Sequence, residues 1–576
     1  MTTASVTIAD PKEFARNCVP STAAVGVREG QAALSLERCA IAALVLIVVL
    51  GFGLRIRGLD GAGFNEDEVQ KVNAARAYLH GDFLVNLEHP MLLKSMIAVS
   101  LAAADNRNRG LGPSHRVSDE FAVRLPNVIF GTLTSVVIFG VAGEFFDLQV
   151  ALLSALLWSC GTIAIMDNRL AKEDTLLVFF TWLGYYFFIR AKKASAIYAP
   201  QPSKSFGKWY AASGASFGLM MASKYFPHYL GLVLLYYILP RRRWDYPSFR
   251  KRDYWYLLGT CAAVFLIANP VILFPGTIKY MLHYVGEGTM THHGYLMMGQ
   301  FHFDEPWRIG GGMPFYFYPL MLAIKTPIPV LCALVVGLVE VVRRRKESGA
   351  SFLILMFLIW IVPFSLLSSK WLRWMLSWMP AIYIIAAIGL VKIFSWTQKL
   401  VLANRSRLLI PALNALIFLV FIAQPVWSAT NAGPIYSLYL NPLGFGRAGY
   451  YFPHEEFLDA GLRPAIFKIC NEAPAGAAVG GEAPPLFAYY FHRCGRDDLH
   501  YFSLSDAHRE TLPPSTYLVV EDGRKYFENI SFIEAITSEH APAWTTAIDG
   551  VPAVAVYKTS ELTELRNAHE SNVTLR

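Results

Sequence analysis

Three adjacent acidic residues, Glu66, Asp67 and Glu68, follow the first long apolar run of the sequence, in the stretch GFNEDEVQ. Two arginines, Arg55 and Arg57, precede them at the edge of that apolar run. A carboxylate in such a place can accept a proton from a hydroxyl group, and neighbouring cations can stabilise an anion that departs in the same reaction. The residue types therefore indicate acid–base chemistry beside an anion-binding site.

Further ionisable side chains occur in short polar stretches between the later apolar runs. A few carboxylates among many cations are typical of a pocket that binds an anion and also contains a base. Phosphate is the anion that arginine and lysine commonly bind in proteins, and the adjacent apolar runs suggest the phosphate of a lipid. The residues in question are Glu88, His89, Lys94, Arg169, Lys172, Glu173, Asp174, Lys224 (followed by Tyr225), His292, His293, Lys370 and Arg373.

The composition indicates an integral membrane protein. The 576 residues are 54% hydrophobic and 16% charged, whereas soluble domains usually carry about 25% charged residues. The apolar residues form many separate runs, as membrane-spanning segments do. The net charge of +8 comes in short clusters between these runs. This pattern follows the positive-inside rule, so nucleic acid is not an expected partner.

The apolar runs predict a polytopic α-helical membrane protein with about eleven spanning helices. The runs lie near residues 39–54, 122–142, 150–166, 175–189, 209–222, 228–239, 254–274, 315–341, 351–368, 374–393 and 408–427. With Met1 in the cytoplasm, the cytoplasmic side receives the basic loops 190–208, 241–253, 343–347 and 392–407, as the positive-inside rule requires.

The same topology places the ionisable residues named above on the outer side of the membrane. This topology requires that the moderately apolar stretch Pro90–Ala104 does not cross the membrane. We therefore expect this stretch to lie along the outer surface as an interfacial helix. Charged groups that converge on one face of a membrane protein indicate a single functional site there.

Three regions follow from this pattern. Residues 1–37 are polar and lack helical periodicity, which predicts a flexible cytoplasmic leader. Residues 38–427 would form the membrane domain, with its first outer loop at 55–121. Residues 428–576 mix strand-like runs (TYLVVED, VPAVAVYK) with helical ones, which predicts a small extracytoplasmic α/β domain. In an oxidising compartment this last region could contain a disulfide between Cys470 and Cys494.

Five segments, taken in order, resemble a known family. They are FNEDEVQKVNAARAYLHGDF with EHPMLLK, VRLPNVIFGTLTSVVIFGVAGEFFD, NRLAKEDTLLVFF, GLMMASKYF and SSKWLRWMLSWMP. Together they resemble the polyprenyl-phosphate-sugar-dependent, C-type glycosyltransferases, in the branch that includes protein O-mannosyltransferases and the lipid A aminoarabinose transferase. The resemblance covers about residues 40–395. The C-terminal tail resembles that of the family only in its general character and not in its motifs.

The resemblance implies roles for the motif residues. Asp67 would be the catalytic base with Glu68 as its partner, and Asp174 would be a second active-site acid that orients the acceptor or the donor sugar. In the aminoarabinose branch a divalent metal can sit between a Glu and a late-loop His, and Glu88 and His292 are the matching candidates; no other cofactor is implied. The substrate-binding residues would be His89, Lys94, Arg169, Lys172, Lys224, Tyr225, Lys370 and Arg373.

Simpler structural roles are open for several of these residues. Asp67 and Glu68 could balance the charge at the start of an interfacial helix, and Asp174 could cap the apolar helix that follows it. If Asp67 is structural, Glu66 or Asp174 becomes the leading candidate for the base. The histidines at 292 and 293 could be ordinary loop residues. Three lysines could extend their side chains to the lipid headgroups without binding substrate: Lys94, Lys224 and Lys370.

The favoured hypothesis is an inverting glycosyltransferase of the bacterial inner (plasma) membrane. It would move a sugar from a polyprenyl-phosphate donor to a lipid, glycan or protein acceptor at the outer face. The alternative is a transporter or flippase of an anionic lipid-linked substrate. Inverted repeats and charges near mid-membrane would favour this alternative, and the sequence shows neither. An acyl- or phosphotransferase acting on the same kind of lipid would also need a carboxylate or histidine among cations.

Overall fold

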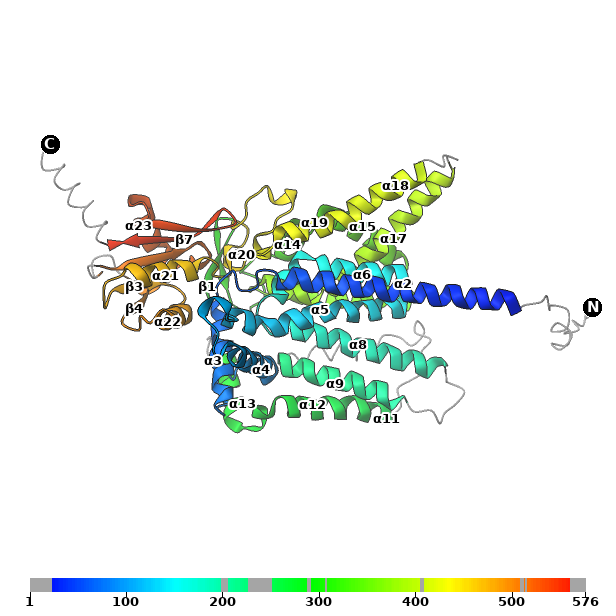
Figure 1. Ribbon diagram of the computed structural model, residues 1–576, viewed down its shortest axis with the longest axis horizontal. Helices are drawn as coiled ribbons and strands as arrows, with labels where there is room; N and C mark the ends of the chain where they lie inside the picture. The colour runs from blue at the N-terminus through cyan, green and yellow to red at the C-terminus, as the bar shows by residue number, and fades with distance from the viewer. Residues whose placement is uncertain are drawn as a thin grey trace, which may run out of the picture.

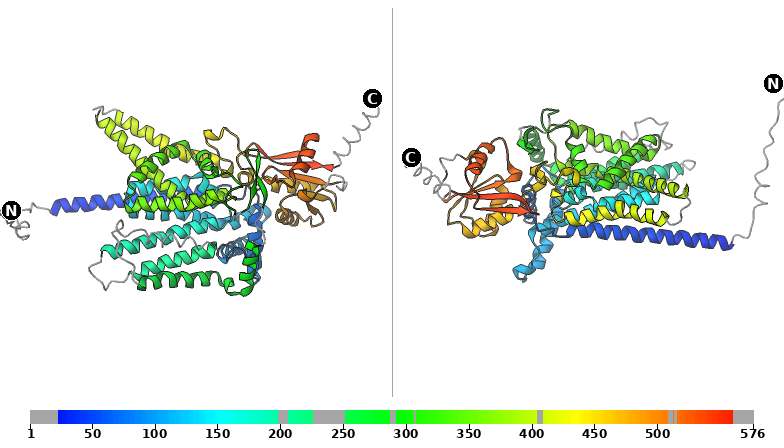
Figure 2. Two further views of the ribbon diagram at one scale, coloured as in Figure 1. Left: turned by 180° about the vertical axis from the view of Figure 1, so that it is seen from behind. Right: turned by 90° about the horizontal axis from the view of Figure 1, so that it is seen from above.

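Long helices lie side by side along one direction, and a domain built on a β-sheet lies beyond one end of them (Figure 1). The computed structural model describes residues 23–197, 206–225, 251–286, 292–305, 308–403, 409–507, 512 and 515–559. The first helix begins at the end of the bundle remote from the sheet, as the two views of Figure 2 also show. The end of the bundle that faces the sheet is called the sheet-proximal end below.

The bundle consists of helices of very different lengths. Five segments of the described chain are long and apolar enough to cross a membrane, and a sixth is added if the bent pair α6–α7 is one span. The other predicted spans are shorter or more polar, and the predicted span 228–239 lies outside the described residues. The helices along the bundle are α2 (Ala23–Ile56), α5 (Asp119–Phe145), α6 (Leu148–Cys160), α7 (Thr162–Asn168), α8 (Asp174–Ile197), α9 (Gly207–Ser223), α11 (Lys251–Tyr254), α12 (Thr260–Ala268), α14 (Phe317–Lys325), α15 (Ile328–Arg343), α16 (Ser348–Leu366), α17 (Met379–Ala403), α18 (Leu409–Phe418) and α19 (Gln424–Ala432).

Two of the predicted single helices are broken in the structure. The run 150–166 bends by 58° at Gly161, where a side chain would collide with the hydroxyl group of Tyr383. The run 315–341 is interrupted before Pro327, because proline lacks an N–H group and forces the preceding residue, Thr326, into an extended conformation.

Helix α2 begins earlier than the sequence analysis predicted. It starts at Ala23, within the region 1–37 that was expected to lack helical structure. The segment from Ala23 to Arg38 contains several strong helix formers, including Ala, Glu, Gln, Leu and Arg, which favour continuation of the spanning helix. Further along α2, the side chains of Ile41, Leu46 and Val49 are more than half exposed, as expected for a helix face that contacts lipid.

Two helices of the first outer loop lie across the sheet-proximal end of the bundle. Helix α3 (Glu66–Leu79) and helix α4 (Met91–Asn108) run crosswise to the long helices (Figure 1). Helix α4 covers the stretch Pro90–Ala104, and it is not among the helices that qualify as membrane spans. Its position agrees with the prediction of a helix that lies along the surface and does not cross.

Shorter elements complete this end of the bundle. Helix α13 (Pro275–Gly286) is followed by a hairpin of strands β1 (His292–Met297) and β2 (Gln300–Asp304). The backbone N–H of Met298, in the hairpin turn, donates a hydrogen bond to the carbonyl of Tyr450 over 3.1 Å. This bond connects the bundle to the segment that leads into the β-sheet domain.

The C-terminal region folds around a five-stranded mixed sheet. The strand order is β4-β3-β5-β7-β6, in which β3 pairs in parallel with β4 and β5, and β7 pairs antiparallel with β5 and β6. Two of the strands, β5 and β7, coincide with the runs predicted as strands. Cys470 and Cys494 form a disulfide in this region. The elements are α20 (Pro453–Phe457), α21 (Leu462–Glu472), β3 (Ala478–Gly481), α22 (Pro484–Arg493), β4 (His500–Ser503), β5 (Tyr517–Glu521), α23 (Ile530–Glu539), β6 (Trp544–Ile548) and β7 (Val551–Lys558).

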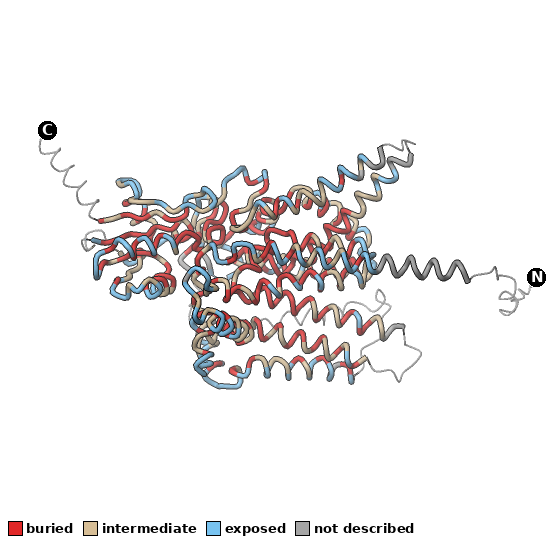
Figure 3. The backbone as a smooth tube through the Cα atoms, in the orientation of Figure 1, coloured by how far each residue is buried: buried red, intermediate tan, exposed pale blue. Residues whose placement is uncertain are grey.

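Buried residues concentrate where the long helices pack together and within the β-sheet domain, while exposed positions follow the outer helices (Figure 3). One continuous cluster of buried apolar side chains includes residues of α3, α5 and α8 and also residues of α21 and α22. The core therefore extends from the bundle across the sheet-proximal end into the β-sheet domain, and it holds the first outer loop between them.

Candidate active site

The three acids of the run Glu66–Glu68 point in three directions. They occupy the first turn of α3, where successive residues are separated by about 100° around the helix axis. Their side chains are exposed to different degrees: 28% for Glu66, 43% for Asp67 and 0% for Glu68. Adjacent residues in the sequence therefore meet three different environments, and only one of these is well open to solvent.

Glu68 is committed to the structure of the loop. Its carboxylate accepts hydrogen bonds from Arg124 Nε and Nη2 (2.9 and 2.6 Å) and from the backbone N–H groups of Asn65 and Ala171, both over 2.9 Å. The bond with Asn65 is half of a capping box at the start of α3. All of these contacts give Glu68 a structural role, and its predicted role as the catalytic partner of Asp67 stays a prediction.

Arg124 extends this structural group to the loop before α3. Its Nη1 and Nη2 atoms also donate to the carbonyl groups of Leu59 and Gly63, over 2.7 and 2.6 Å. The side chain is 4% exposed. Arg124 thus fixes both the entry to α3 and the acid in its first turn, and sequence reasoning did not single it out.

Glu66 faces the β-sheet domain. Its carboxylate accepts a bond from Arg524 Nη1 over 2.6 Å, and its backbone N–H donates to Asp459 over 3.0 Å. Asp459 also accepts from the amide of Asn65 and from two nitrogens of Arg524, at 2.8 to 3.0 Å. The β-sheet domain therefore holds the N-terminus of α3 from the side opposite Arg124.

Asp67 meets a cation from a different loop. Its carboxylate forms an ion pair with Lys172, in the segment between α7 and α8, and the lysine side chain is only 8% exposed. Burial, with the nearby positive charge of Arg373, holds the pKa of Lys172 well below its ordinary value. The structure thus brings together two residues that the sequence analysis had placed in the same site.

Two more predicted site residues form ion pairs in the same neighbourhood. Asp174 pairs with Lys224 over 2.8 Å, and Arg373 pairs over 2.9 Å with Glu455, a residue of α20. The charges of Arg373, Asp174 and Glu455 all act on Lys172, which shows that these pairs are close to one another. The segment after α7, the end of α9, the loop after α16 and helix α20 therefore converge beside Asp67.

Glu455 is a site residue that sequence reasoning missed. It is 2% exposed, and its carboxylate also accepts a bond from the backbone N–H of Leu372. Burial raises the pKa of Glu455 above its ordinary value, and the charge of Arg373 opposes this rise. The motif HEEF gave no signal, because two acids in a short polar stretch of sequence are typical of a solvated helix.

A second group of charges lies beside α3 and is also held by ion pairing. The buried carboxylate of Glu173 lies 2.8 Å from Lys71 Nζ and 3.6 Å from His89 Nδ1. Burial alone would raise the pKa of Glu173, but the neighbouring His89 and Lys71 side chains hold it below the ordinary range. Burial and the charge of Lys71 lower the pKa of His89, so this imidazole is neutral at pH 7.

Three cations that were predicted to bind substrate donate hydrogen bonds to backbone carbonyls, and substrate binding by them stays a prediction. Arg169 donates to the carbonyls of residues 55, 57 and 58 over 2.7 to 2.8 Å. Lys94 donates to those of residues 85, 86 and 89, and burial lowers its pKa to about 7. Lys370 donates to those of residues 313 and 367. These contacts shape the loops around the site.

Tyr225 has a structural partner as well. Its hydroxyl oxygen accepts a hydrogen bond from the side-chain amide of Asn269 over 3.0 Å, and the same amide accepts from the backbone N–H of Met91 at the start of α4. Tyr225 thus contributes to the junction between α4 and α12. Substrate binding by Tyr225 stays a prediction.

The predicted metal site stays untested. Glu88 accepts a hydrogen bond from the side-chain amide of Asn86, and the side chain of His292 lies outside the described part of the structure. Among the described side chains, no group of three or more His, Cys, Asp or Glu residues has a geometry that could hold a metal ion.

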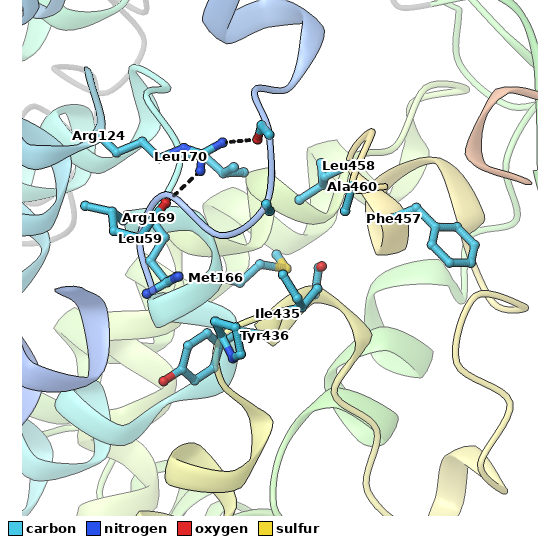
Figure 4. A pocket seen from close by; sticks show the side chains of 14 residues that line it. Leu59, Arg124, Met166, Arg169, Leu170, Ile435, Tyr436, Phe457, Leu458 and Ala460 are labelled. Atoms are coloured by element: carbon cyan, nitrogen blue, oxygen red, sulfur yellow. Dashed lines mark hydrogen bonds between the residues drawn. The ribbon is translucent and has the colours of Figure 1, made fainter. Parts of the chain in front are cut away.

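A cavity of about 50 Å³ lies beside Arg124 (Figure 4). Its lining includes Leu59, Met166, Arg169, Tyr436 and Phe457, and the figure shows the bonds from Arg124 to the adjacent loop. Such a volume holds about one or two water molecules, so it cannot hold a lipid-linked sugar. It belongs to the structural contacts of the first outer loop.

Comparisons with known proteins bear on the family and on the fold of this chain. Residues 115–274 match the model of the dolichyl-phosphate-mannose-protein mannosyltransferase family. This match lies within residues 40–395 and confirms the resemblance found in the sequence. A search of curated proteins gives no significant match.

Two solved structures share the fold. ArnT from Cupriavidus metallidurans, bound to undecaprenyl phosphate, is 16% identical, with a TM-score of 0.50 over 89% of this chain and 97% of that chain. The oligosaccharyltransferase of Archaeoglobus fulgidus in its apo form is 11% identical, with a TM-score of 0.50 over 84% of this chain and 69% of that chain. At these identities the likeness establishes the fold, that of polytopic membrane glycosyltransferases.

Proposed function

We propose that this chain belongs to the polyprenyl-phosphate-sugar-dependent C-type glycosyltransferases and transfers a sugar from a polyprenyl-phosphate donor to an acceptor hydroxyl. The family match over residues 115–274 and the fold shared with ArnT support this proposal. The observation that carries the proposal is the position of Asp67. It is the most exposed acid of its run, and it lies beside a group of cations at the sheet-proximal end of the bundle.

In the proposed reaction, the acceptor oxygen attacks the anomeric carbon of the donor sugar. The bond between that carbon and the phosphate oxygen breaks, and the acceptor proton passes to the Asp67 carboxylate. The polyprenyl phosphate leaves as an anion, so that it needs cations more than it needs a strong acid. Lys172, Lys224 and Arg373 would supply these cations. A single displacement of this kind inverts the anomeric centre.

The buried acids take supporting roles in this proposal. Asp174 keeps Lys224 in place and would orient a sugar hydroxyl, since its carboxylate lies beside the same cations as Asp67. His89, as a neutral imidazole, would donate a hydrogen bond to the phosphate or the sugar. The acceptor would be a lipid, a glycan or a protein.

We further propose that the site faces the outside of an inner (plasma) membrane. The support is the distribution of basic loops in the sequence, since 190–208, 241–253, 343–347 and 392–407 all lie on the side opposite the acidic run in the predicted topology. The β-sheet domain would then be extracytoplasmic, where the Cys470–Cys494 disulfide is stable.

The test is sugar transfer in membranes that contain the full chain, with radiolabelled polyprenyl-phosphate sugars as donors. Asp67→Asn keeps the size of the side chain and removes the base. We expect the wild type to transfer label and Asp67→Asn to lose transfer per folded molecule. Its thermal stability should also fall, because the buried Lys172 loses its anionic partner. Equal transfer by both proteins would exclude Asp67 as the base, and a wild type that transfers none of a broad donor panel would contradict the proposed reaction.

A further inference from the structure

Each cation proposed to bind the donor phosphate is already paired with an acid. Lys172 contacts Asp67, Lys224 lies 2.8 Å from Asp174, and Arg373 lies 2.9 Å from Glu455. A phosphate that enters this group must compete with carboxylates for the same N–H donors. The structure therefore raises the question of which pair opens first.

The three pairs differ in what happens to the acid that is released. The side chains of Asp174 and Glu455 are 4% and 3% exposed, so either would become an unpaired buried charge. Leaving a buried charge without its partner costs about 3–5 kcal/mol. Asp67 is 43% exposed, so water can solvate its carboxylate once the contact with Lys172 is broken. The pair Lys172–Asp67 is therefore the one that can open at the lowest cost.

Lys172 cannot follow its partner into water as readily. Its side chain is 8% exposed, and it lies in the short segment between α7 and α8, which is fixed on one side by the bond from the Ala171 N–H to Glu68. The lysine is thus the stationary member of the pair, and the acid is the member that can change its environment. A buried ammonium group needs an anionic partner in either state.

We propose that Lys172 exchanges partners during the reaction. In the free protein it holds Asp67, and on donor binding the phosphate takes the place of the carboxylate and releases Asp67 to the acceptor hydroxyl. This inference rests on the proposed function and adds an order to it: the donor binds before the base is available. The exchange breaks one ionic hydrogen bond and forms another, and no covalent bond or proton is transferred in it.

The exchange predicts a specific thermodynamic coupling. Asp67 and the donor phosphate compete for Lys172, so removal of the carboxylate should strengthen phosphate binding. The gain should depend on the presence of Lys172, because without the lysine there is nothing to compete for. Coupling between two sites is reciprocal for binding free energies, and values of about 5- to 150-fold are typical.

The experiment is a double-mutant cycle on the binding of undecaprenyl phosphate to the purified full chain in lipid nanodiscs. The four proteins are the wild type, Asp67→Asn, Lys172→Met and the double variant. We expect Asp67→Asn to bind about tenfold more tightly than the wild type, and Lys172→Met to bind more weakly. In the Lys172→Met background, Asp67→Asn should have no further effect. If Lys172→Met does not fold, Lys172→Gln takes its place in the cycle.

Glu66→Gln is the matched control, because it neutralises the neighbouring acid of the same helical turn, whose partner is Arg524. We expect its affinity to equal that of the wild type. If Glu66→Gln and Asp67→Asn raise the affinity for undecaprenyl phosphate equally, the effect is general charge repulsion and the exchange is overturned. The same holds if Asp67→Asn raises that affinity equally in the wild-type and the Lys172→Met backgrounds. If the wild type transfers label but binds no undecaprenyl phosphate, the exchange is also overturned. If the wild type neither binds undecaprenyl phosphate nor transfers label, the proposed function itself is contradicted.

Discussion

Two ion pairs of the same helical turn differ in the features that decide their roles. The pair Glu68–Arg124 is buried, with side-chain exposures of 0% and 4%, and the acid accepts four hydrogen bonds. The pair Asp67–Lys172 joins a half-open acid to a buried lysine from another loop. The comparison teaches that a multiply bonded, buried acid holds the loop in place, whereas the exposed acid beside it can meet a substrate.

The same contrast separates the remaining charges. Asp459 with Arg524, and Glu173 with Lys71, are buried pairs that belong with Glu68. The backbone-bound cations Arg169, Lys94 and Lys370 belong with them, because their contacts fix loops. On this view most of the charged residues at the sheet-proximal end hold loops in place around the one ion pair that exchanges partners, Asp67–Lys172.

The largest expected loss of stability comes from Arg124→Met. It removes the partner of Glu68 and the two bonds to the loop before α3, which leaves a buried carboxylate unpaired. Breaking a buried pair from one side costs about 3–5 kcal/mol. Thermal unfolding in detergent should show this loss. A variant with wild-type stability would remove the distinction between the two pairs.

The next effect is a pH-dependent one at Glu173. Its folded-state pKa lies below the ordinary value, so its ion pair stabilises the protein above the ordinary pKa of a glutamate and is lost as the pH falls. Glu173→Gln should cost about 3 kcal/mol at pH 7. The difference from the wild type should shrink as the pH is lowered below about 4.3. A difference in unfolding midpoint that is independent of pH would contradict this role.

Arg524→Met tests the contact between α3 and the β-sheet domain. It removes charged hydrogen bonds to Asp459 and Glu66, but Asp459 keeps its bonds from Asn65 and from the Glu66 N–H, so we expect a loss of about 2 kcal/mol in all. We expect lower stability and lower transfer, since the N-terminus of α3 carries Asp67. Lys558→Met, which loses a partly exposed ion pair with Glu472 in the same domain, is the control; it should cost less than about 1 kcal/mol and leave transfer unchanged. Unaltered transfer in Arg524→Met would show that the domain does not position the base.

The smallest effect is expected for Tyr225→Phe. The hydroxyl accepts one bond from Asn269, so its loss should cost about 1 kcal/mol of stability. If the residue is structural, the KM for the donor should stay within about twofold of the wild-type value. A large rise in the donor KM at unchanged stability would move Tyr225 into the substrate-binding group, as the sequence analysis predicted.

The sequence was sufficient to predict features that depend on local pattern. The non-spanning helix at Pro90–Ala104 followed from its length and modest hydropathy, while its place at the membrane surface stays a prediction. The acids of GFNEDEVQ do begin a helix. Asp67, Lys172, Asp174, Lys224 and Arg373 were also grouped correctly, because the predicted topology placed their loops on one side.

Features that depend on contacts between distant segments could not be predicted. Glu66 and Arg524 are separated by 458 positions, and Arg373 and Glu455 by 82. The sequence also could not distinguish Glu68 from Asp67, since both are acids of one turn and differ only in what packs against them. The helix breaks at Gly161 and Pro327 were missed because apolar runs on both sides continue without interruption.

The central claim is that Asp67, of the three adjacent acids, performs the chemistry. The most direct test is the single-turnover rate of sugar transfer per folded molecule for Glu66→Gln, Asp67→Asn and Glu68→Gln. The account predicts that Asp67→Asn loses about 10²- to 10⁴-fold in this rate, while the folded fraction of Glu68→Gln falls and its rate per folded molecule is largely kept. A folded Asp67→Asn protein that transfers at the wild-type rate, with the loss found in Glu66→Gln or Glu68→Gln, would contradict it.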